Sequence, residues 1–208
     1  FMYVLIFLKK SHFKEEKLFL FGFDKEVIKV ILKLGLPATV QMIVVQFSYL
    51  AITIMLNAYG VVIASASGIG LKIITFMVAP IWAIGRAVSA MVCQNIGAGD
   101  IKRTEKICII GLKMSLVVTF FVVLIFQIFA RHIVMFFDEN ISVVENGVIY
   151  MRIAGSIGFF AYTTMFIFDI FAVGAGNGIF GLINSIIDAV LMKILLCFIL
   201  GFTLNFGY

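Results

Sequence analysis

The chain has 208 residues, of which 63% are hydrophobic and 13% are charged, and its formal net charge is +5. Soluble domains are about 45–50% apolar and about 25% charged, so this composition excludes an ordinary soluble domain and indicates an integral membrane protein. The Lys and Arg residues cluster beside apolar runs, which suits an anionic cytoplasmic leaflet, and no nucleic-acid-binding motif is present.

The first 35 residues are predicted to precede the main bundle. Residues 1–8 are too short to span a bilayer and lack a basic leader, so we interpret them as the end of a preceding transmembrane helix and the chain as a fragment. Residues 9–35 are predicted to form a basic cytoplasmic connector that ends in an amphipathic helix capped by Asp24. This helix is expected to lie on the membrane surface, with a solvated linker helix as the alternative.

The transmembrane bundle is predicted to occupy residues 36–208. Its first span, 36–59, is expected to begin where Pro37 breaks the preceding helix. Uncharged polar groups such as Gln41 interrupt this span, so one side of it is expected to meet protein or a cavity. The turn at 57–60 has no basic residue near it and is therefore assigned to the outer side of the membrane.

The second span, 61–98, is too long for an upright crossing, since it would reach about 55 Å at 1.5 Å per residue. It must tilt, bend or project from the membrane, and Pro80 is the expected kink. Lys72 and Arg86 lie within it. Because charges inside a membrane usually face a bundle interior or water, Lys72 is a candidate pathway residue, and snorkelling to an interface is its alternative.

A polar turn with the sequence QNIGAGDIKR follows this span. The glycines suit the positive φ of a helix end, and Asp100 suits the cap of the next helix. Basic residues in a first helical turn oppose the helix dipole, so a cytoplasmic loop that sets orientation explains them better. The residues assigned to this cytoplasmic turn are Gln94, Asn95, Gly97, Gly99, Asp100 and Arg103.

The third span, 107–130, is predicted to be a packing and lipid-facing helix whose only strongly polar interior group is Gln127. Residues 131–145 are predicted to form an acidic outer loop. The fourth span, 147–173, carries Asp169 near its inner end. A second Gly-Ala-Gly turn at 174–177 repeats the pattern of the first, although such turns are common helix ends and coincidence is an alternative.

The fifth span, 179–202, contains Asp188 and Lys193. They are five positions apart, so in an α-helix they are not expected to face each other directly. Asp188 lies near the predicted midplane. An acid there indicates a functional site, with a structural ion pair as the alternative.

The sequence contains no recognisable metal or catalytic cluster. Its cysteines lack CxxC spacing, and neither histidine has a neighbouring ligand. The HExxH and GxSxG motifs are absent as well, so an enzyme is not expected. The residues concerned are Cys93, Cys108, Cys197, His12 and His132.

Five features together resemble the second half of a multidrug and toxic compound extrusion (MATE) transporter. They are LGLPATVQ at 34–41, NAYG at 57–60, GIGLKI at 68–73, Pro80, and QNIGAGDIKR at 94–103. The resemblance implies an all-α transmembrane bundle that forms one lobe of a two-lobed transporter. About five complete spans and the end of a preceding helix would be present, and the last helix would be missing.

What the resemblance implies about function is secondary active efflux by alternating access. The substrates would be cationic lipophilic compounds, exchanged for H⁺ or Na⁺ without a bound cofactor. The partners would be the missing N-terminal lobe and the bilayer, in a bacterial cytoplasmic membrane. Residues expected along the substrate or ion pathway are Gln41, Lys72, Asp169, Asp188 and Lys193. The alternatives are a lipid or lipid-linked-sugar flippase and a non-transporting membrane scaffold.

Overall fold

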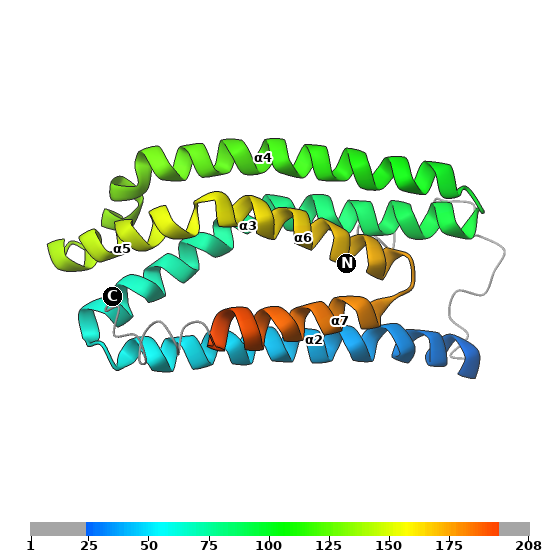
Figure 1. Ribbon diagram of the computed structural model, residues 1–208, viewed down its shortest axis with the longest axis horizontal. Coiled ribbons are helices and arrows are strands. Elements are labelled where there is room, and N and C mark those ends of the chain that lie inside the picture. The colour runs from blue at the N-terminus through cyan, green and yellow to red at the C-terminus, as the bar shows by residue number, and fades with distance from the viewer. Residues whose placement is uncertain (1–23, 196–208) are drawn as a thin grey trace, which may run out of the picture. The chain divides into compact units, whose positions relative to one another are not determined.

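The structure is a computed structural model that describes residues 24–195 (Figure 1). The chain divides into two compact units, Phe1–Lys33 and Leu34–Tyr208, and the helix packing described lies within the second. The predictions for residues 1–23 and 196–208 lie outside the described residues. The helices are α2 (Lys25–Asn57), α3 (Val61–Gly97), α4 (Ile101–Met135), α5 (Ile141–Ala154), α6 (Ile157–Gly174), α7 (Gly178–Ile186) and the π-helix η2 (Ile187–Leu195).

Five helical segments in the described part are long and apolar enough to cross a membrane. They are α2, α3, α4, α6, and the continuous run of α7 and η2. The connections alternate between two ends of the bundle: α3–α4 and α6–α7 are joined at one end, and α2–α3 and α4–α5 at the other (Figure 1). This arrangement confirms the predicted all-α, polytopic bundle.

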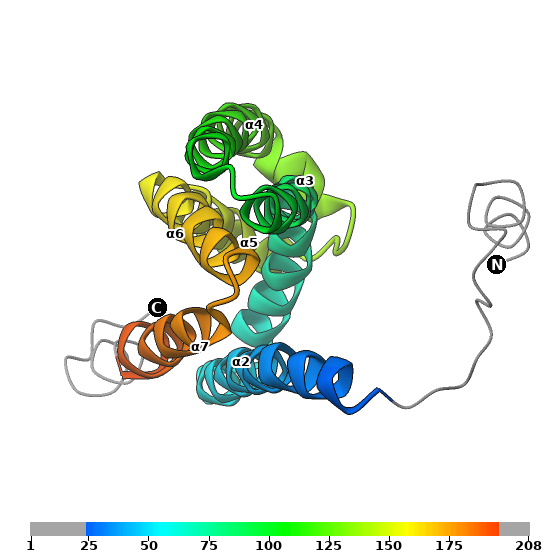
Figure 2. The ribbon, with the colours of Figure 1, turned by 90° about the vertical axis from the view of Figure 1, so that its right-hand side faces the viewer.

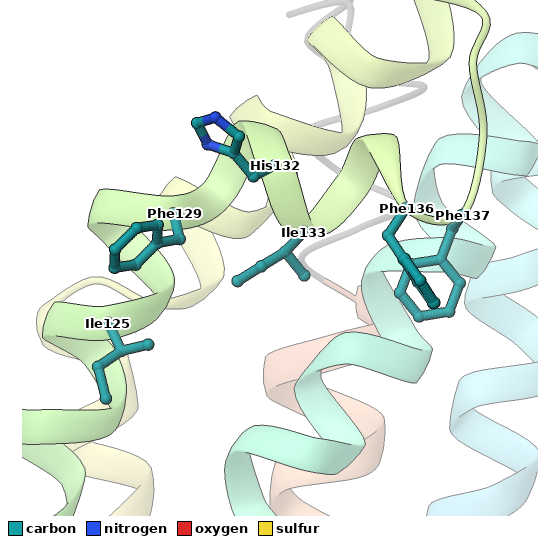
Figure 3. Close-up of a pocket in the computed structure, with 6 residues that line it drawn as sticks. All are labelled: Ile125, Phe129, His132, Ile133, Phe136 and Phe137. Atoms are coloured by element: carbon teal, nitrogen blue, oxygen red, sulfur yellow. The ribbon is translucent and has the colours of Figure 1, made fainter.

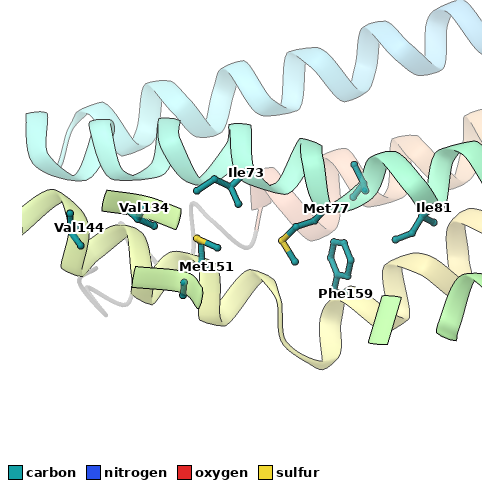
Figure 4. Close-up of a cluster of buried hydrophobic side chains, with 9 residues drawn as sticks. Ile73, Met77, Ile81, Val134, Val144, Met151 and Phe159 are labelled. Carbon is teal, nitrogen blue, oxygen red and sulfur yellow. The ribbon is translucent and has the colours of Figure 1, made fainter. Parts of the chain in front are cut away.

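The core is built around the middle of α3. Ile73, Met77 and Ile81 lie there at no more than 1% exposure and meet apolar side chains of α4, α5 and α6 (Figure 4). Since lipid tails are as apolar as these side chains, close packing rather than escape from water must hold such helices together. α3 changes direction along its length (Figure 1), as expected for a long helix that contains Pro80.

The expected break at Pro37 is wrong, because α2 runs without interruption from Lys25 to Asn57 and contains this proline. Proline removes one backbone donor, but the other hydrogen bonds of a long apolar helix persist. The Thr39 hydroxyl also donates to the Gly35 carbonyl oxygen at 2.8 Å in the same turn. The predicted cap is confirmed, since an Asp24 carboxylate oxygen accepts from the backbone N–H of Glu26 at 2.9 Å.

The predicted outer loop at 131–145 is mostly helical. α4 continues to Met135, and α5 begins at Ile141 after a short turn. His132 lies in the last turn of α4, where a basic side chain complements the helix dipole. The Asn140 side chain caps α5 by accepting from the Ser142 N–H at 3.0 Å.

The predicted fourth span is not one helix but two, because the chain breaks at Gly155 and Ser156 between α5 and α6. The side-chain amide of Gln127 reaches this break from α4. Its Nε2 donates to the carbonyl oxygens of Arg152 and Gly155, both at 3.0 Å. Gln127 therefore supports an interrupted backbone, and the prediction that α4 only packs and faces lipid missed this role.

The two Gly-Ala-Gly turns have the same backbone geometry. In each, the residue after the second glycine donates its N–H five residues back: Asp100 to Asn95 and Asn177 to Ala172, both at 2.9 Å. Gly99 and Gly176 take positive φ values of 76° and 86°. Asp100 and Asn177 then cap the next helix through a side-chain oxygen. The repeat noticed in the sequence is therefore a repeated structural motif.

Candidate functional site

Polar side chains on α7 and η2 connect this segment to two other helices. The Gln41 amide of α2 donates to the Ser185 hydroxyl at 2.7 Å. The neighbouring Asn184 donates to Asp169 of α6. In both ribbon views α7 runs beside α2 (Figures 1 and 2). We call this set the polar cluster: Gln41, Tyr49, Asp169, Asn184, Ser185, Asp188 and Lys193.

Asp169 is the buried acid of the polar cluster, with only 6% of its surface exposed. Asn184 Nδ2 lies 2.9 Å from one carboxylate oxygen and 3.0 Å from the other. Within residues 24–195, no lysine or arginine forms a salt bridge with it. A buried carboxylate is costly when ionised unless its charge is compensated, and within residues 24–195 the hydrogen-bond partner of Asp169 is this neutral amide.

Asp188 and Lys193 form an ion pair, which corrects the expectation that they do not face each other. Lys193 Nζ lies 2.7 Å from Asp188 Oδ2. The reason is the π-helical backbone of η2, whose hydrogen bonds join residues five apart and so bring side chains at this spacing together. In an α-helix, by contrast, residues three or four apart are neighbours.

Aromatic rings lie next to the polar cluster. The Lys193 ammonium lies 5.0 Å from the centre of the Tyr49 ring on α2. On α6, the ring of Tyr162 stacks against those of Phe159 and Phe166, and its hydroxyl oxygen lies 3.3 Å from Trp82 Nε1 of α3. The Tyr49 ring offers a negative face to a cation, whereas Phe159 belongs to the buried apolar core.

Of the five predicted pathway residues, the structure brings four into the polar cluster. Gln41, Asp169, Asp188 and Lys193 lie on α2, α6 and η2 and contact α7, η2 or each other. Lys72 is separate from them. It is exposed on α3 and makes no hydrogen bond or salt bridge within residues 24–195.

The sequence-based prediction of the pathway omitted Asn184, Ser185 and Tyr49. Asn184-Ser185 is an adjacent polar pair inside an apolar span. Polar interruptions of an apolar span predict a side that meets protein or a cavity, and this pair is such an interruption of the fifth span. Tyr49 could not be assigned because its contact with Lys193 depends on the packing of two helices.

An apolar hollow lies apart from the polar cluster, at the far end of α4 (Figure 3). It shares no residue with the polar cluster, and His132 is its one titratable side chain. No partner of His132 other than the Phe129 ring occurs in the part of the chain described. We therefore assign the candidate site to the polar cluster. The residues lining the hollow are Ile125, Phe129, His132, Ile133, Phe136 and Phe137.

The chemistry of the polar cluster is that of binding. Amide, hydroxyl, carboxylate, ammonium and aromatic groups are present, and together they can hold a cation or exchange a proton. Within residues 24–195, no three His, Cys, Asp or Glu side chains are grouped as metal ligands.

Comparison with known proteins now identifies the family. The family model described as MatE matches residues 37–199, which include all seven members of the polar cluster. The chain belongs to the MatE family. Its members are transporters and not enzymes.

Two curated relatives come from Bacillus subtilis (strain 168). The chain is 28% identical over 114 residues to the probable multidrug resistance protein YoeA, an alignment that covers 55% of this chain and 25% of YoeA. It is 40% identical over 74 residues to the probable multidrug resistance protein YpnP, which covers 36% of this chain and 17% of YpnP.

The fold is also that of solved MATE structures. A crystal structure of a MATE point mutant superposes with a TM-score of 0.85 at 16% identity, over 96% of this chain and 45% of that chain. The chain thus spans less than half the length of the relatives it matches. That proportion is consistent with one lobe of a two-lobed MatE transporter.

Proposed function

We propose that this chain is the C-terminal lobe of a secondary active exporter of cationic lipophilic compounds, coupled to H⁺ or Na⁺ and located in a bacterial cytoplasmic membrane. The single observation that carries the proposal is the polar cluster, which places two carboxylates between apolar spans of a MatE-family chain. Intramembrane acids are costly, and in transporters they mark ion or substrate pathways.

The two acids suit different tasks because their partners differ. Asp169 is held by a neutral amide, so binding a proton or Na⁺ would compensate its charge. Asp188 is already compensated by Lys193. Alternating access would then arise from rocking of this lobe against the N-terminal one, with the polar cluster on the wall of the central cavity.

A flippase for anionic lipids or lipid-linked sugars would need a cationic cavity. Lys72, Arg86 and Lys193 are the basic residues that would supply it. Asp188 neutralises Lys193, and Lys72 and Arg86 are exposed on α3. The exporter has the stronger support because the polar cluster also holds Asp169, a buried acid that forms no salt bridge with a lysine or arginine within residues 24–195. A non-transporting scaffold is distinguished from it by the flux measurement.

The test measures ion-gradient-driven efflux of ethidium from cells that produce the full-length gene product. Asp169→Asn is expected to reduce the initial efflux rate at least about tenfold because it removes the acid that would take up the coupling ion, and Asp188→Asn is expected to do so because it leaves Lys193 without its carboxylate partner. Glu139→Gln is the matched control, since Glu139 is exposed in the α4–α5 turn. Wild-type efflux by both variants at wild-type protein levels would reject a coupling role, and absence of gradient-dependent flux from the wild type would reject transport.

A further inference from the structure

Lys193 is held by two different groups that recognise cations. One is the Asp188 carboxylate on its own helix, at 2.7 Å, and the other is the Tyr49 ring on α2, at 5.0 Å from the ring centre. A carboxylate together with an aromatic face is the combination that binds ammonium and other organic cations. The chain's own lysine thus occupies a position built for a monovalent cation.

Two features of the backbone place Asp188, Lys193 and Tyr49 next to one another. The π-helix η2 brings Asp188 and Lys193 together across five positions. The contact with Tyr49 repeats the spacing of a second contact with the same helix α2, because Tyr49 follows Gln41 by eight positions and Lys193 follows Ser185 by eight positions. Two contacts with matching spacing fix the register of α2 against α7 and η2, so the position of Tyr49 follows from this register.

The site is partly open. The Lys193 and Asp188 side chains keep 25% and 26% of their surface exposed, and Tyr49 keeps 36%. Lysine carries its ammonium on a flexible four-carbon stem, so the ammonium can move away from Asp188 and Tyr49 while the backbone stays in place. Withdrawal leaves a carboxylate and a ring face, and another cation of single charge restores neutrality. An organic cation suits this position better than a strongly hydrated metal ion, because it is weakly hydrated and stacks on aromatic faces.

From this geometry we infer that Asp188 and Tyr49 form a subsite for the charged group of a lipophilic organic cation, and that Lys193 is the tethered cation that competes for it. Lys193 and the organic cation cannot occupy the subsite at the same time. Lys193 sets the affinity of the subsite by its local concentration, which a short tether raises to the millimolar range or above. The inference rests on the proposed function, because it names where the exported cation is held.

The test measures equilibrium binding of radiolabelled tetraphenylphosphonium to the purified full-length protein in nanodiscs. Lys193→Met removes the competing charge but keeps a long side chain, and it is expected to tighten binding about tenfold or more. Lys193→Arg keeps a cation and is expected to bind like the wild type. Lys113→Met, which removes an exposed lysine from α4, controls for the change in net charge.

Two further variants test the other groups in the Lys193→Met background. Adding Asp188→Asn is expected to abolish the gain in tetraphenylphosphonium binding. Both members of the ion pair are then neutral, so no unpaired charge is left to interfere with folding. Adding Tyr49→Leu is expected to reduce the gain several-fold, whereas Tyr49→Phe keeps the ring and is expected to keep the gain. Tetraphenylborate, an anion of matched size, is expected to show no gain.

Each outcome has a definite reading. Unchanged or weaker binding by folded Lys193→Met, or an equal gain for tetraphenylborate or in Lys113→Met, overturns the inference. If wild type exports and binds tetraphenylphosphonium while Lys193→Met shows no gain, the inference fails and the proposed function stands. If no variant binds or exports the cation, both fail.

Discussion

Gln127 supplies hydrogen bonds to backbone carbonyl groups at the break between α5 and α6. It is a single amide in a long apolar helix, and it donates to two carbonyl oxygens at the end of α5. Carbonyl oxygens at a helix end lack a helical donor, and Gln127 supplies one to each of these two. The sequence shows Gln127 as an isolated polar residue, but it cannot show that its partner is a break at the end of the next helix.

Replacing Gln127 with leucine is expected to destabilise the protein by about 1–3 kcal/mol for each carbonyl left unpaired. Leucine keeps a side chain of comparable size but removes the donor. The measurement is the thermal unfolding midpoint of the full-length protein in detergent, followed by tryptophan fluorescence. Gln46→Leu is the control, because Gln46 is exposed on α2 and forms no hydrogen bond in the described region. Equal midpoints for the two variants would contradict a supporting role for Gln127.

Helix ends were predictable where they depend on local chemistry. Both Gly-Ala-Gly turns and the caps at Asp24 and Asp100 follow from residues within a few positions. The interruption at Gly155 and the π-helix η2 were not predictable in this way. Hydrophobic periodicity indicates that a segment is helical and apolar, but it does not distinguish one helix from two short ones or an α-helix from a π-helix.

The two turns have the same hydrogen bonds, but their first glycines differ in surroundings. A Cβ added to Gly174 at the end of α6 would lie 2.8 Å from the carbonyl oxygen and 3.0 Å from the Cα of Ser89 on α3. A Cβ added to Gly97 at the end of α3 would meet no atom within 4 Å. Gly174 therefore allows α6 to approach the α3 backbone.

Gly174→Ala is expected to lower stability by about 1–3 kcal/mol, because backbone atoms cannot move aside as a side chain can. Gly97→Ala is the matched substitution and is expected to change stability by less than about 0.5 kcal/mol. Both are read from the temperature at which the full-length protein loses its monodisperse elution profile. A loss of stability in the second variant alone would contradict the contact between α6 and α3.

At the scale of the whole molecule, the alternating ends of the spans predict which turns share a side of the membrane. Turns 97–100 and 174–177 lie at one end of the bundle, and turn 57–60 lies at the other (Figure 1). Lys102, Arg103 and Lys106 beside the first of these turns predict that its end is cytoplasmic.

Single cysteines at these turns test the orientation in a background without native cysteines. Cysteine at Ala98 or Ala175 is expected to resist a membrane-impermeant maleimide in intact cells and to react after permeabilisation. Cysteine at Ala58 is expected to react in both conditions. All three positions are exposed, so accessibility depends on the side of the membrane. Labelling of position 98 from outside would reverse the predicted topology.

The two Gly-Ala-Gly turns have the same conformation but differ in the charge of the residues that follow them. Asp100 is followed by a basic cluster, whereas Asn177 is followed by Gly178, Ile179 and Phe180, without a charge. The backbone path is the same in both turns. The features that the two turns share are their glycines and the side-chain oxygen that caps the next helix, so these determine the shape of the hairpin. Charge at such a hairpin is free to vary without remodelling it, so insertion direction and loop conformation can evolve independently in this bundle.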